Sequence, residues 1–113
     1  MKLIYVAGKY TTGSDIDSAA INRNIEHAEL ASVRLMGLGH NVFTPHKNFA
    51  YYEKYENEDD PDNPFGWQFW MDRCMDMLQR CDAIYMLKGW EDSTGATQEH
   101  KYAKELGLEI MYE

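Results

Sequence analysis

The residues Leu3–Ala7 form a continuous apolar and aromatic run that ends at Gly8. An unbroken run, rather than an alternation of apolar and polar residues, is typical of a β-strand that is buried on both faces. Strands of this kind occur in parallel sheets that are covered by helices on both sides. The beginning of the chain therefore favours a buried strand in an α/β sheet.

Helical and strand patterns alternate along the rest of the chain. Apolar residues recur at helical spacing from Asp17 to the glycines Gly37 and Gly39, and again over 65–81 and 96–106. Short strand-like runs lie at 41–45, 82–87 and 108–112, so the predicted order is β-α-β-α-β-α-β. The connections are long enough for right-handed crossovers, which predicts a small parallel sheet with helices on both faces.

Length and composition limit the class of protein. A chain of 113 residues, 44% hydrophobic and 27% charged, has room for one core, so we expect one domain over residues 1–113. No apolar run approaches the roughly 20 residues of a membrane helix, and no signal peptide is recognisable. The net charge of −8 argues against a nucleic-acid partner. Cys74 and Cys81 lie seven residues apart in one predicted helix, too far apart for a disulfide, and we expect a reducing, cytoplasmic setting.

Three predicted loops follow the strands: 8–15, 45–64 and 88–95. Ligands of open α/β sheets bind beyond the carboxyl ends of the strands, so these loops are expected to form the site. The irregular segment 45–64 contains six acids between Glu53 and Asp62, and we expect a surface loop whose aromatic first half covers a pocket. We expect substrate contacts from residues of all three loops: Gly8, Lys9, Tyr10, Thr11, Gly13, His46, Trp90 and Gly95.

The loop 8–15 offers two glycines, three hydroxyls and Lys9 at a strand-to-helix turn. It contains neither of the common glycine-rich nucleotide fingerprints. Binding of an anion by its backbone amides and service as an ordinary turn both remain open. The four histidines show no metal-ligand spacing, so we expect no metal and no cofactor.

Glu99 is the most unusual residue of the last predicted helix. With Ala96, Ala103 and Leu106 it lies on the stripe that should face the sheet. Near the start of the helix the dipole favours an ionised carboxylate, which suits a nucleophile or a ligand anchor. The alternative is a boundary glutamate that reaches water. Ser93 precedes the same helix, and the phenol of Tyr5 would meet the carboxylate if it points to the same side of the sheet.

These residues occur in a pattern that resembles the nucleoside 2-deoxyribosyltransferase superfamily. The resemblance rests on Ile4–Gly8, on Cys81–Tyr85 and above all on Gly89–His100, and it covers nearly the whole chain outside 46–64. It is strongest to short bacterial and phage members, and more distant to the 2′-deoxynucleoside 5′-phosphate N-glycosidases. It implies a flavodoxin-like (Rossmann-like) three-layer α/β/α fold with four or five parallel strands, in a homodimer or larger homo-oligomer.

The resemblance also implies an activity, cleavage or transfer at the N-glycosidic bond of a deoxynucleoside or its 5′-monophosphate. Glu99 matches the nucleophile, Tyr5 the tyrosine that holds it, Ser93 a position that contacts substrate, and Gly95 a glycine that lets the backbone approach the sugar. Retaining glycosyl transfer needs such a carboxylate opposite the leaving base. Where relatives carry an aspartate associated with the leaving base, this sequence has Cys74, so we expect another acid, Asp92, to serve.

Two other interpretations remain open at this point. The pocket can be a module that binds a nucleotide without turnover, as the replacement by Cys74 suggests. The protein can also be a flavin carrier, with Thr11–Ser14 at the phosphate and Trp90 or Tyr51 stacked on the ring.

Overall fold

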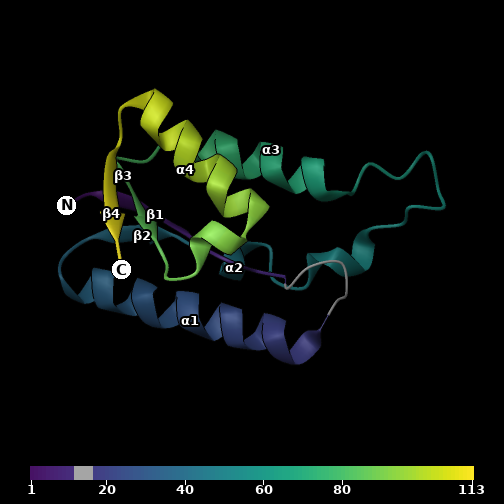
Figure 1. Ribbon diagram of the computed structural model, residues 1–113, viewed down its shortest axis with the longest axis horizontal. Helices are drawn as coiled ribbons and strands as arrows, with labels where there is room; N and C mark the ends of the chain where they lie inside the picture. Colours follow the sequence, from purple (N-terminus) through teal and green to yellow (C-terminus); the bar gives the residue numbers. More distant parts are fainter. Residues whose placement is uncertain (12–16) are drawn as a thin grey trace.

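The computed structural model describes residues 1–11 and 17–113 (Figure 1). Four parallel strands form one sheet in the order β2-β1-β3-β4: β1 (Leu3–Ala7), β2 (Asn41–Phe43), β3 (Ala83–Met86) and β4 (Glu109–Tyr112). The chain passes from β1 to β2 on one side and then crosses to β3 on the other, so the strand order reverses beside β1. The predicted three-layer α/β/α fold with a small parallel sheet is confirmed.

Helix α1 (Ser18–Gly37) covers one face of the sheet, and α3 (Trp67–Leu78) and α4 (Thr94–Leu106) cover the other (Figure 1). Because side chains alternate along a strand, β1 contributes to two cores. Ile4 and Val6 pack with Ala28, Ala31 and Leu35 of α1. Tyr5 and Ala7 lie in the opposite core with residues of α3 and α4. The alternation decides which face of the sheet receives the phenol of Tyr5.

The helix ends follow from local sequence. Asp17 caps α1 by accepting hydrogen bonds from the amides of Ala19 and Ala20, and Ser93 caps α4 by accepting one from Ala96. Gly39 and Gly107 lie at φ 99° and 74°, a left-handed conformation that glycine adopts without strain. These caps fix where α4 begins, directly after the loop that follows β3.

The segment 45–64 is more ordered than predicted. It contains a short helix, α2 (Pro45–Asn48), and a 3₁₀ turn, η1 (Tyr52–Tyr55), and a second 3₁₀ turn, η2 (Trp90–Asp92), precedes α4. Pro45 does not merely end the second strand but begins α2, where its fixed φ suits the first turn. The helix α3 is shorter than the predicted 65–81. Within 1–11 and 17–113, no helix has the length and apolar character needed to cross a membrane.

Candidate active site

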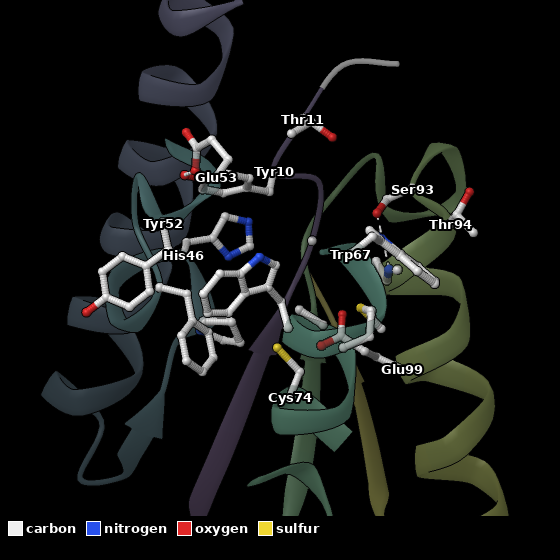
Figure 2. Close-up of a pocket in the computed structure, with 18 of the residues that line it drawn as sticks. Tyr10, Thr11, His46, Tyr52, Glu53, Trp67, Cys74, Ser93, Thr94 and Glu99 are labelled. Carbon is white, nitrogen blue, oxygen red and sulfur yellow. Dashed lines mark hydrogen bonds between the residues drawn. The ribbon is translucent and has the colours of Figure 1, made fainter. Parts of the chain in front are cut away.

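A cavity of about 590 Å³ opens at the carboxyl ends of β1 and β3, a size typical of small-molecule sites. Residues from all three predicted loops line it, together with residues of α3 as far as Cys74 and of α4 as far as Glu99. In Figure 2, Ser93 and Glu99 lie on the α4 side, Tyr10, His46, Tyr52 and Glu53 lie opposite, and Cys74 lies toward the floor. Of the expected site residues the cavity is lined by Gly8, Tyr10, Thr11, His46, Asp92, Ser93, Gly95 and Glu99.

Glu99 lies at the inner end of this cavity. Its side chain is 6% exposed, and it accepts a hydrogen bond from the phenol of the fully buried Tyr5. Ala96 and Ala103 flank it on the buried stripe of α4, as the helical spacing predicts, whereas Leu106 at the end of the stripe is exposed. The two groups that the sequence separates by more than ninety positions therefore form one buried carboxyl–phenol pair.

The protonation of Glu99 differs from the prediction. The helix dipole was expected to keep the carboxylate ionised, but burial raises the pKa of Glu99 from 4.5 to about 7, and the hydrogen bond from Tyr5 only partly opposes this. The desolvation of a fully buried charge therefore outweighs the partial charges at the helix start. A carboxyl with a pKa near 7 exists in both forms at neutral pH, which is a common property of catalytic acids and bases. Burial, together with the charge of Glu99, also raises the pKa of Tyr5 well above its usual value, so the phenol stays protonated and donates.

Cys74 of α3, after Glu99 and Tyr5, is the third group at the inner end of the cavity. It is 6% exposed, and burial together with the nearby charge of Glu99 raises the pKa of its thiol to about 12. A thiol with this pKa does not supply a proton readily near pH 7. Asp72 and Asp76 on either side are exposed, as expected from their positions on the helix, and do not replace it.

The start of α4 forms one wall of the cavity. The hydroxyl of Ser93 caps the helix by accepting a hydrogen bond from the amide of Ala96 at 3.1 Å, and Ser93 also lines the cavity, where it was expected to contact substrate. A Cβ at Gly95 would lie 3.2 Å from the sulfur of Met71 and 4.0 Å from the hydroxyl of Ser93. A glycine at this position therefore keeps the wall open close to the backbone.

The loop after β1 contributes less than predicted. Gly8, Tyr10 and Thr11 line the cavity, but Lys9 does not, and its ammonium lies 3.9 Å from the carboxylate of Asp92. Gly13 lies outside the described residues, and so does part of the loop for which anion binding and service as an ordinary turn were both left open. Asp92 itself stands at the cavity wall with 76% of its side chain exposed.

His46 is almost completely buried beside Tyr10. Its Nε2 lies 2.8 Å from the backbone carbonyl of Lys9. Because a carbonyl only accepts, Nε2 carries the proton, and burial lowers the pKa of His46, so the ring is neutral. Its Nδ1 is then a buried acceptor, and it has no hydrogen-bond partner among the described residues.

Aromatic side chains form the outer part of the cavity. Phe49, Tyr52 and Trp70 meet with ring centroids 5.7–6.1 Å apart, and Trp67 also lines the cavity although 48% of it is exposed. The prediction that the aromatic part of 45–64 covers a pocket agrees with this arrangement. The role of Trp67 and Trp70 was missed because their helical spacing is also that of ordinary core residues.

Trp90 was expected beside the substrate but does not line the cavity. Its ring packs on His100 at 4.3 Å between centroids and near Tyr112. Tyr51 also lies outside the cavity wall and donates a hydrogen bond to Asn22. The two aromatic residues expected to stack on a flavin are therefore used elsewhere. In the described part of the chain, no three His, Cys, Asp or Glu side chains are grouped as a metal site would require.

The sheet, its covering helices and the buried carboxyl–phenol pair beyond the strand ends place the chain among flavodoxin-like α/β proteins. Among the solved structures that share this fold are two 2-deoxyribosyltransferases. A 2-deoxyribosyltransferase of Bacillus psychrosaccharolyticus, described as a biocatalyst for nucleoside synthesis, superposes with a TM-score of 0.61 and 23% identity over 97% of this chain and 70% of that enzyme. A 2-deoxyribosyltransferase of Leishmania mexicana gives 0.57 and 22% over 99% of this chain, which spans 63% of that enzyme.

Sequence comparison gives the family. The model of a domain of unknown function, DUF4406, matches residues 2–112, and the chain belongs to this family. The family is associated with the nucleoside 2-deoxyribosyltransferase superfamily, so the resemblance stated from the sequence is confirmed. No curated protein matches the sequence significantly.

Proposed function

We propose that this protein cleaves or transfers at the N-glycosidic bond of a deoxynucleoside, a nucleoside or a 5′-monophosphate of either, with Glu99 as the nucleophile. The observation that carries the proposal is the buried Glu99 carboxyl, hydrogen-bonded by Tyr5 at the inner end of a ligand-sized cavity. The similarity of fold to two 2-deoxyribosyltransferases supports the same class of reaction.

The reaction proceeds in two steps. In the first, a carboxylate oxygen of Glu99 forms a bond to the anomeric carbon while the bond from that carbon to the base nitrogen breaks, and the electron pair leaves with the base. In the second, water or another base attacks the same carbon and releases Glu99. Tyr5 holds the carboxylate in position, and the wall formed by Ser93 and Gly95 receives the sugar. Because only the ionised carboxylate attacks, the rate rises with pH through the pKa of Glu99, about 7.

A neutral base needs a proton as it leaves. Cys74 is a poor source because of its raised pKa. We assign this role to Asp92, which lies at the cavity wall and is accessible to solvent.

Release of free base from a panel of nucleosides, deoxynucleosides and their 5′-monophosphates, followed by chromatography, tests the proposal. Glu99→Ala should reduce the release by at least a thousandfold, whereas Glu105→Ala, an exposed position on the same helix, should leave it unchanged. Equal release by the wild type and Glu99→Ala would disprove the assignment of the nucleophile.

A second function, binding of a nucleotide without turnover, is favoured by one observation. The residue beside Glu99 that faces the cavity is a thiol of high pKa rather than an acid. If this is the function, nucleotides raise the midpoint of thermal unfolding and no product forms. Measured together, thermal shift and base release separate the two functions.

A further inference from the structure

The charged side chains that line the cavity are all acidic among the described residues. Besides Glu99, four carboxylates line it, those of Glu53, Glu56, Glu58 and Asp92. Among the described residues that line it none is Lys or Arg, and the segment 12–16 contains neither residue in its sequence. The ammonium of Lys9, which does not line the cavity, lies 3.9 Å from the carboxylate of Asp92 and offsets its charge, so the excess negative charge comes from Glu53, Glu56 and Glu58. The potential inside the cavity is therefore negative, which repels anions and attracts cations.

The buried imidazole of His46 agrees with this bias. The Nε2 proton of this ring is donated to the carbonyl of Lys9, so the lone pair of Nδ1 is the remaining polar group of the ring. His46 lines the cavity, and its Nδ1 is buried without a hydrogen-bond partner in the described structure. A buried acceptor without a partner calls for a ligand that donates a hydrogen bond or carries positive charge.

The apolar part of the wall is equally suited to a cation. The rings of Phe49, Tyr52 and Trp70 meet one another, and Glu56 accepts a hydrogen bond from the indole nitrogen of Trp70 at 2.8 Å. Aromatic faces combined with carboxylates are the usual surroundings of organic cations, because the rings attract positive charge while excluding water.

We infer that the preferred substrate is an unphosphorylated N-glycoside whose leaving base is positively charged, such as a pyridinium or an N-alkylated purine nucleoside. The inference rests on the proposed function and specifies the substrate class of the same site. A cationic leaving base also explains why Cys74, a thiol, stands where relatives carry an aspartate. When its bond to the anomeric carbon breaks, the electron pair returns to the ring nitrogen and the base leaves neutral, so no proton is needed. Glu99 gains the bond to the sugar, and water then releases the sugar.

Binding is measured first, in the Glu99→Gln variant, which cannot turn over. The probes are nicotinamide riboside, a pyridinium cation, and benzamide riboside, its neutral carbon-linked isostere. We expect nicotinamide riboside to bind at least tenfold more tightly. One charge pair at roughly 7 Å in water changes binding about threefold, so Glu56→Gln with Glu58→Gln should remove about a tenfold preference. The control pair Glu26→Gln with Glu105→Gln removes the same charge from exposed positions outside the cavity and should remove little of it.

Turnover is measured next with the wild type, on nicotinamide riboside, 7-methylguanosine, guanosine and the 5′-monophosphates, each corrected for spontaneous hydrolysis. Faster enzymatic release from the cationic, unphosphorylated members supports the inference. If neutral nucleosides are cleaved through Glu99 and the two ribosides bind equally, the inference is wrong while the proposed function stands. If the cation binds preferentially but is not cleaved, the inference about the leaving base is overturned and the second function is favoured. If no nucleoside is bound or cleaved, the proposed function itself is wrong.

Discussion

Replacing Glu99 by glutamine should make the protein more stable at alkaline pH while abolishing base release. Glu99 has a pKa of about 7 in the folded protein against 4.5 for an unperturbed carboxyl. A raised pKa means that the folded state holds the proton more tightly than the unfolded state. The contribution of the protonated carboxyl is therefore fully present below pH 4.5 and is lost as the pH rises through about 7.

The size of the effect follows from the same shift. A difference of this size corresponds to about 3 kcal/mol of destabilisation once the buried carboxyl is ionised. Glutamine retains an oxygen that accepts from Tyr5, but it leaves a buried amide group without an assigned partner, which costs about 1 kcal/mol. The Glu99→Gln variant should therefore gain about 2 kcal/mol at pH 8.5, or about 8 °C in unfolding midpoint for a chain of this size. Near pH 4.5 the folded wild type holds the proton on Glu99 and escapes the penalty of ionisation, so the variant should be less stable there by about 1 kcal/mol.

The assay is thermal unfolding of the wild type, Glu99→Gln and Glu105→Gln across pH 4.5–8.5. Glu105 lies exposed on the same helix, so its variant should follow the wild type at every pH. A Glu99→Gln variant that is destabilised equally at both ends of the range would refute the reasoning, because it would mean that the ionised carboxylate carries no desolvation cost.

Three further predictions concern other parts of the structure. Tyr5→Phe removes the hydrogen bond that lowers the pKa of Glu99, so the rise of the pH–rate profile should move upward by roughly one pH unit and the rate at pH 7 should fall about fivefold; an unchanged profile would show that Tyr5 does not act through the pKa of Glu99. Gly8→Ala brings a Cβ to 2.7 Å from the side chain of Leu87, which should lower the free energy of unfolding in urea by about 1–3 kcal/mol. A variant as stable as the wild type would show that the backbone at the end of β1 shifts to accommodate the methyl group. Phe65, which precedes α3, and Trp67, its first residue, are 36% and 48% exposed, and we expect a homodimer or larger oligomer; sedimentation that finds only monomer at micromolar concentration would contradict this.

The sequence by itself determined the framework of this protein. The parallel sheet and its two helical layers followed from the apolar run of β1 and from the change to helical spacing after it. A strand that is buried on both faces is apolar throughout, and this pattern is visible in a few consecutive residues. Asp17 and Gly107 cap their helices through residues that are close to them in sequence. The position of Glu99 on the buried stripe of α4 was readable for the same reason, because helical periodicity fixes which residues share a face.

Only the tertiary structure decided what those residues meet. Whether the phenol of Tyr5 faced α1 or α4 depended on the pleat and register of β1, which a continuous apolar run does not encode. Trp90 does not line the cavity, because an aromatic side chain in a loop can turn to either side of its strand, and here the ring packs on His100. The pKa of Glu99 was misjudged because the helix dipole is local, whereas desolvation depends on every element that closes over the carboxyl.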